Sequence, residues 1–85
     1  MEKKDIRIVI LQRGWIYIGE FSKDGVECRL KNAKNIRRWG TTNGLGELAK
    51  KGKQEETQLD EAGTVRFHEL TIVAMLECDN DVWKF

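Results

Sequence analysis

An Asp-Gly pair at residues 24 and 25 stands between two stretches in which apolar and polar side chains alternate. Both residue types tolerate the positive φ angles of a two-residue hairpin turn, so the pair is the strongest short turn signal in the chain. The residues that follow, 26–31, alternate strictly and place Val26, Cys28 and Leu30 toward the interior. The pair therefore commits this part of the chain to antiparallel β structure.

Residues 5–11 predict a strand that is buried on both faces, because they are rich in β-branched side chains. Its two faces carry Ile6, Ile8 and Ile10 on one side and Val9 and Leu11 on the other. A turn at residues 12–14 leads into a returning strand at residues 15–21. The first 31 residues are therefore expected to form a three-stranded meander.

A short helix is expected in the middle of the chain. Leu45, Leu48 and Ala49 form an apolar stripe at helical spacing, and Gly52 provides a natural stop. Residues 53–62 are polar and are expected to form a loop.

Two strands are expected after this loop, a short one at residues 63–67 and a long one at residues 69–78. Alternation along the long strand turns these residues inward: Leu70, Ile72, Ala74, Leu76 and Cys78. The chain ends with two aromatic residues at spacing two, Trp83 and Phe85. Their spacing suits packing across a sheet edge or onto a second subunit.

Together these elements predict a single α+β domain over residues 1–85 that is mostly β. We expect a small antiparallel sheet or barrel-like domain with a meander of three strands, one short helix and one or two C-terminal strands. A chain of 85 residues buries a modest fraction of its surface when it folds alone, so a homo-oligomer, a dimer or a tetramer, is expected. The apolar runs are too short to cross a bilayer, and the first residues lack the apolar core of a secretory signal. A cytoplasmic protein without a membrane partner is therefore expected.

Residues that could carry catalysis are sparse. Cys28 and Cys78 lie far apart without a CxxC motif, so they are expected to be small core residues and not zinc ligands. His68 is the single histidine, and we favour a structural role for it over a catalytic one. No enzymatic activity, no metal and no cofactor are expected.

Basic residues concentrate in residues 29–53, which hold eight lysines and arginines and one acidic residue, although the whole chain has a net charge of only +1. Proteins that bind long nucleic acids tend to be basic overall, so a long nucleic acid is not the expected partner. A few phosphates held locally fit this charge distribution better.

The centre of the basic stretch is Arg37-Arg38-Trp39. An arginine can hold a phosphate with two hydrogen bonds, and a tryptophan face can stack on a base. Four residues then lead into the expected helix: Thr41, Thr42, Asn43 and Gly44. One of the first three is expected to cap the helix, whose first N–H groups attract a phosphate.

Trp15 and Tyr17 share one strand face and complete the candidate ligand-binding residues, although we favour a core role for this pair. A plain structural interpretation of the basic stretch stands beside the binding interpretation. In it, Trp39 fills the core where the chain turns, the arginines are solvated, and residues 41–44 form only a loop and a cap. The sequence supports the two interpretations equally.

Short motifs relate the chain to a known group of proteins. They are Leu30-Lys31-Asn32-Ala33-Lys34, Ile36, Trp39-Gly40, Leu45-Gly46-Glu47-Leu48-Ala49, the strand at residues 70–78 and Val82-Trp83. In these motifs the chain resembles a family of small phage-encoded proteins, and it is similar to the phage anti-CBASS sponge proteins. It departs from the pattern at Arg37 and Arg38, where aromatic residues are usual, and at Lys34, where arginine is usual.

Sponge proteins bind cyclic oligonucleotide immune signals such as cyclic GMP-AMP without cleaving them, and they do so as oligomers. The resemblance therefore implies a phage protein of immune evasion that sequesters a cyclic dinucleotide or a related ligand in an infected bacterial cell. Arginines would hold the phosphates and aromatic residues would stack on the bases. Two alternatives stay open: a protein that inhibits a host defence complex through a protein–protein interface, and a small nucleic-acid-binding barrel.

Overall fold

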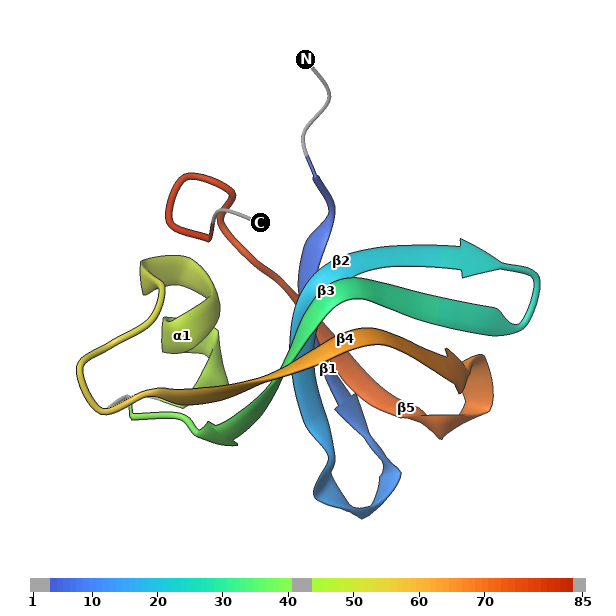
Figure 1. The fold of residues 1–85 in the computed structure, drawn as a ribbon, viewed down its shortest axis with the longest axis horizontal. Coiled ribbons are helices and arrows are strands. Elements are labelled where there is room, and N and C mark those ends of the chain that lie inside the picture. Colours follow the sequence, from blue (N-terminus) through green and yellow to red (C-terminus); the bar gives the residue numbers. More distant parts are fainter. Residues whose placement is uncertain (1–3, 41–43, 84–85) are drawn as a thin grey trace.

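Five antiparallel strands and one α-helix make up residues 4–40 and 44–83, the part of the chain that the computed structural model describes (Figure 1). In chain order the elements are β1 (Ile6–Leu11), the 3-10 helix η1 (Gln12–Gly14), β2 (Ile16–Asp24), β3 (Glu27–Arg38), α1 (Leu45–Lys51), β4 (Gln58–His68), the 3-10 helix η2 (Glu69–Thr71) and β5 (Ile72–Glu77). The strands form one sheet in the order β4-β3-β2-β1-β5. The expected α+β, mostly β class and the three-stranded meander are confirmed.

β1 separates two apolar clusters, as its sequence predicts. Ile6 and Ile8 are buried in a cluster on the face that α1 covers, and Ile10 packs against the same cluster. Val9 is fully buried in a second cluster on the opposite face, and Leu11 packs against that one. The prediction that this strand is buried on both faces is confirmed.

The second cluster is enclosed by the curvature of the sheet. β2 and β3 bend together, and their register shifts between Ile18 and Glu20 (Figure 1). Gly19 lies at this shift, where an added Cβ would come within 3.1 Å of the Cα of Ala33. Glycine at this position therefore allows the close approach that the bend requires.

β3 and β4 are longer than expected. β3 continues to Arg38, and β4 begins at Gln58, so the prediction of a loop over residues 53–62 is wrong for its second half. The cause is cross-strand pairing, in which Ile36 lies opposite Leu59 and adds it to the cluster beneath α1. Residues 58–62 hold two apolar residues among three polar ones, and this local pattern does not reveal the pairing with β3.

Three residues that were expected to face inward are exposed. Ala74 is exposed in the middle of β5, which pairs with β1 alone among the described strands. Val26 is 52% exposed because it belongs to the turn and not to β3, whereas Cys28 and Leu30 are fully buried as predicted. Leu70 is 77% exposed because it lies in η2, which interrupts the alternation expected for residues 69–78. β5 therefore starts only at Ile72.

α1 packs on the sheet through Leu45, Leu48 and Ala49, the stripe that the sequence predicts. Trp83 is 6% exposed, and its indole Nε1 donates a 2.8 Å hydrogen bond to the carbonyl of Leu48. The expectation that this aromatic lies across an edge or on a second subunit is therefore wrong, because it fills the core beside α1. Across residues 4–40 and 44–83, no helix has the length and apolar character needed to cross a bilayer.

Replacement of Trp83 should lower the free energy of unfolding by about 3–5 kcal/mol in Trp83→Ala, and by less in Trp83→Phe, which keeps part of the buried volume. Urea denaturation followed by circular dichroism measures both changes. Trp15→Ala is the matched control, because Trp15 is 56% exposed and should cost far less. Equal losses at residues 15 and 83 would contradict the packing described here.

Both thiols should resist alkylation in the folded protein. Cys28 is fully buried, and burial raises the pKa of the Cys78 thiol to about 12. Because the thiolate is the nucleophile, iodoacetamide at pH 8 should modify neither residue until urea unfolds the chain. Mass spectrometry of the two states measures this, and rapid modification of native Cys78 would show that its side chain is not held as described.

Candidate functional site

Two aromatic side chains stack at the start of β2. The rings of Trp15 and Tyr17 lie 6.5 Å apart between centroids, with an interplanar angle of 13°. Tyr17 packs against the cluster that contains Val9, whereas Trp15 is 56% exposed. The favoured core role therefore fits Tyr17 and is wrong for Trp15. Trp15 lies just before β2, and more than half of its side chain is open to solvent.

The strand register places Arg37 on the same face as this stack. Tyr17 pairs with Asn35, and the Asn35 amide nitrogen donates a 3.3 Å hydrogen bond to the carbonyl of Ile16. Arg37 follows Asn35 by two residues in β3, so alternation places it on the face of β3 that Tyr17 adjoins, beyond the last pair of the β2–β3 register. Trp15 stacks on Tyr17, so the three side chains belong to one face of the sheet, near the end of the β2–β3 pairing. We name Trp15, Tyr17 and Arg37 the aromatic–arginine surface.

Arg37 is held by a carboxylate from the neighbouring strand. Its Nε and Nη2 atoms donate hydrogen bonds of 2.8 and 2.6 Å to the two carboxylate oxygens of Asp60. These hydrogen bonds hold the pKa of Asp60 below its usual value and raise that of Arg37. The side chains are 64% and 45% exposed, so solvent screens the pair and a ligand phosphate can compete for the guanidinium.

Arg38 and Trp39 form a separate group. Consecutive strand residues point to opposite faces, and Arg38 lies 3.8 Å from a carboxylate oxygen of Glu56 and not near Asp60. The hydroxyl of Thr57 donates a 2.6 Å hydrogen bond to the Trp39 carbonyl and fixes the backbone there. Trp39 is 41% exposed, so the interpretation that it fills the core is wrong.

Gly40 allows the backbone to turn directly after Arg38 and Trp39. An added Cβ would come within 2.3 Å of the Thr57 nitrogen, and its φ of 68° favours glycine. The strand therefore turns against the segment before β4 only because this position has no side chain. That contact ties Trp39 to the start of β4.

The expected phosphate site at the helix start gains no support from the geometry. Thr41, Thr42 and Asn43 lie outside the described residues, and the N-cap position is Gly44, which has no side chain to cap the helix. α1 contains only seven residues, so its dipole is small. Binding by residues 41–43 stays a prediction.

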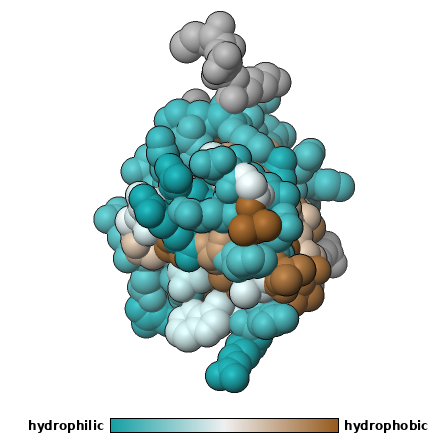
Figure 2. Space-filling model, turned by 90° about the vertical axis from the view of Figure 1, so that its right-hand side faces the viewer, coloured by the Kyte–Doolittle hydropathy of each residue, from teal (hydrophilic) through white to brown (hydrophobic). Residues whose placement is uncertain are grey.

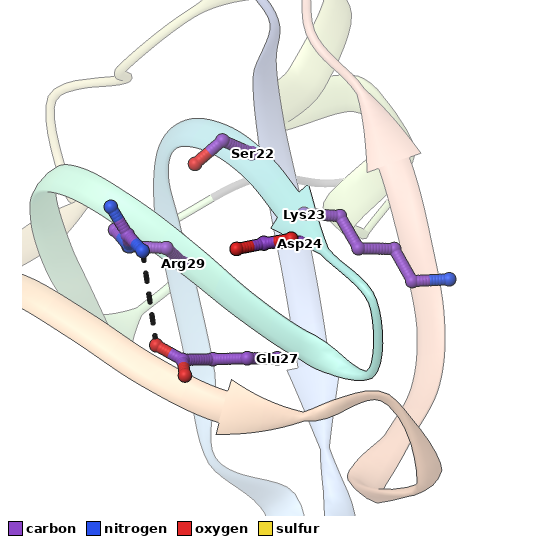
Figure 3. Close-up of a pocket in the computed structure, with 5 residues that line it drawn as sticks. All are labelled: Ser22, Lys23, Asp24, Glu27 and Arg29. Atoms are coloured by element: carbon purple, nitrogen blue, oxygen red, sulfur yellow. Dashed lines mark ion pairs between the residues drawn. The ribbon is translucent and has the colours of Figure 1, made fainter.

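A cavity of about 240 Å³ lies at the other end of the β2–β3 hairpin and was not anticipated from the sequence (Figure 3). It is lined by Ser22, Lys23, Asp24, Glu27 and Arg29. Alternation in β2 and β3 indicates that most of these residues share one face, but the twist that makes the surface concave is not visible in the pattern.

The charges of this cavity largely balance. Arg29 lies 3.9 Å from Glu27, and Lys23 extends away from the other side chains to a 2.6 Å ion pair with Glu69 (Figure 3). The Arg29 Nε is buried without a hydrogen-bond partner among the described residues. Because Asp24 and Glu27 repel anions, one unpaired nitrogen does not make this cavity a phosphate site.

His68 has the structural role that the sequence favours. It is the N-cap of η2, and its Nδ1 accepts a 3.0 Å hydrogen bond from the backbone nitrogen of Leu70. In the described part of the chain, no group of histidine, cysteine, aspartate and glutamate side chains could hold a metal ion. The described residues thus concentrate their candidate binding groups at the aromatic–arginine surface.

No protein-family model matches this chain, and no curated protein matches it. The resemblance to phage proteins therefore rests on its short motifs, and the aromatic–arginine surface rests on its geometry. Sequence reasoning selected Trp15, Tyr17 and Arg37 separately. The signal that unites them is the register of β2 against β3.

The Arg37–Asp60 pair predicts a pH dependence. A carboxylate whose pKa is lowered by folding stabilises the protein above its unfolded pKa, and this stabilisation is lost as the pH falls through the folded value. Melting temperatures of the native chain and of Asp60→Asn should therefore differ at pH 7 and converge in strong acid.

Carbon-13 NMR of the Asp60 carboxyl measures the same effect directly. Its pKa should lie below about 3.9 in the native chain and return toward that value in Arg37→Gln. Arg66→Gln is the matched control, because Arg66 is similarly exposed and should leave Asp60 unchanged. An ordinary pKa for Asp60 in the native chain would refute the ion pair.

Proposed function

We propose that this chain is a non-enzymatic protein that binds a small nucleotide through the aromatic–arginine surface. The resemblance to phage sponge proteins suggests the ligand class, a cyclic oligonucleotide signal of the cyclic GMP-AMP kind. On this proposal the chain sequesters the signal during infection and so blunts a host defence. The protein would act by holding its ligand and not by changing it.

The observation that carries the proposal is the placement of an exposed tryptophan ring and an exposed arginine on one face of the sheet, near the end of the β2–β3 pairing. Trp15 offers a ring face to a base, and base–aromatic stacking contributes roughly 1–3 kcal/mol. Arg37 offers a planar fork that fits a phosphate, and a phosphate would replace the solvent-screened carboxylate of Asp60 on its Nε and Nη2 atoms. The groups thus match the two chemical parts of a nucleotide.

A second candidate function is the binding of a short single strand of nucleic acid. Arg38 and Trp39 repeat the arginine and aromatic chemistry close to Arg37 but on a separate part of the surface. A ligand that used both groups would have to pass around the end of β3, which suits several linked nucleotides better than one cyclic dinucleotide. Steep salt dependence of the affinity would distinguish this case.

The proposal predicts a thermal shift with cyclic dinucleotides or trinucleotides. A ligand at about 100 times its dissociation constant adds about 2.7 kcal/mol of stability, which raises the melting temperature of a small domain measurably. Trp15→Ala and Arg37→Gln should each reduce the shift, and Arg66→Gln should leave it unchanged. The bound ligand should be recovered intact after heat denaturation.

Asp60→Asn sharpens this test, because it releases Arg37 from its carboxylate and removes a negative charge. Affinity for the nucleotide should rise several-fold if Arg37 holds a phosphate. No shift with any cyclic nucleotide would overturn the proposed function. A thermal shift that persists in both Trp15→Ala and Arg37→Gln would show that the nucleotide binds at another site.

A further inference from the structure

β5 is an edge strand with little charge to oppose pairing, although its register against β1 shifts at Val73. Among the described residues it pairs with β1 alone, so one side of its backbone is open. Residues 72–76 are all apolar, and Val73 and Met75 are 65% and 37% exposed. A free edge of this composition is a template for another strand, and proteins usually guard such an edge with charges or cover it.

The opposite edge, β4, is guarded. It carries Asp60, Glu61, Arg66 and His68 along its length, and its pairing with β3 shifts register around Gly63, which has a φ of 72°. Charges of this kind discourage the addition of a further strand, and β5 carries only Glu77, whereas register shifts occur at both edges. The two edges of the sheet therefore differ in their capacity for association.

Exposed apolar side chains adjoin the open edge. Leu70 is 77% exposed in η2, directly before β5, and Val26 is 52% exposed. The Glu69 nitrogen donates a 2.9 Å hydrogen bond to the Val26 carbonyl, which brings these two turns together. Figure 2 shows this side of the molecule, where brown hydrophobic surface is exposed among hydrophilic side chains.

We propose that β5 pairs in antiparallel fashion with β5 of a second copy of this chain and forms a two-fold symmetric dimer. Pairing centred on Ala74 would place Val73 opposite Met75 of the partner subunit, so that exposed apolar side chains cover each other. The one charged residue of β5, Glu77, would lie opposite Thr71 of the partner subunit and would not meet its own copy.

The strand is thus complementary to itself in both hydrophobicity and charge. These features favour a second copy over an unrelated strand, because an unrelated strand would need to match the same pattern by chance. The inference does not depend on nucleotide binding, since β5 contributes no residue to the aromatic–arginine surface. A variant that loses dimer formation could therefore still be tested for nucleotide binding, and the reverse also holds.

Light scattering coupled to size-exclusion chromatography tests the dimer. The native chain should elute with twice the mass of one chain, and Val73→Lys should elute as a monomer, because a charge at this edge opposes strand addition. Val82→Lys is the matched control, since Val82 is also an exposed valine, 43% exposed, but lies outside β5. It should remain dimeric.

Hydrogen exchange of the native chain gives a second measurement that needs no variant. Amides of residues 72–77 that face away from β1 should be protected at high concentration and should exchange faster on dilution. A monomer at every concentration would overturn the proposal, as would a dimer whose β5 amides exchange equally at all concentrations. A dimer that survives in folded Val73→Lys would also overturn it.

Discussion

The burial of β1 on both faces is the constraint on which the rest of the structure depends. Ile6 and Ile8 point to one side and Val9 to the other, and all three are almost completely removed from water. Burial of a side chain of this size stabilises the fold by about 1.5–3 kcal/mol, so neither face can be left uncovered. One face is covered by α1 and Trp83, and the other by the curvature of the sheet itself.

This arrangement determines where functional groups can lie. Both faces at the centre of the sheet are occupied by the core, so polar and aromatic groups with access to solvent are found at strand ends and edges. Trp15 lies just before β2, and Arg37 lies one residue before the end of β3. The binding chemistry proposed here is therefore a property of one end of the sheet and not of its broad surface.

Short sequence patterns correctly predicted the elements that depend on neighbouring residues, namely strands, a turn and a helix. Alternation identified the two faces of β1, and a three-residue stripe identified α1. The Asp-Gly pair identified the β2–β3 hairpin, but the turn residues are Gly25 and Val26, because Asp24 is the last residue of β2. The same patterns failed where a partner strand decides the outcome, as in residues 58–62, or where a 3-10 helix interrupts alternation, as at Leu70. Pairing between distant segments leaves no periodic signal in either segment.

For the candidate site, too, the sequence predicted the residue types but not how the fold groups them. The sequence indicated which side chains could bind a nucleotide, but it grouped Arg37 with Arg38 and Trp39 because they are neighbours in the chain. Alternation in β3 separates these neighbours and places Arg37 on the face that Tyr17 and its stacked partner Trp15 share. β1 lies between β2 and the open edge at β5, so ligand binding and association would use different strands of one sheet. The two properties can therefore be altered independently, and this separation follows from the strand order alone.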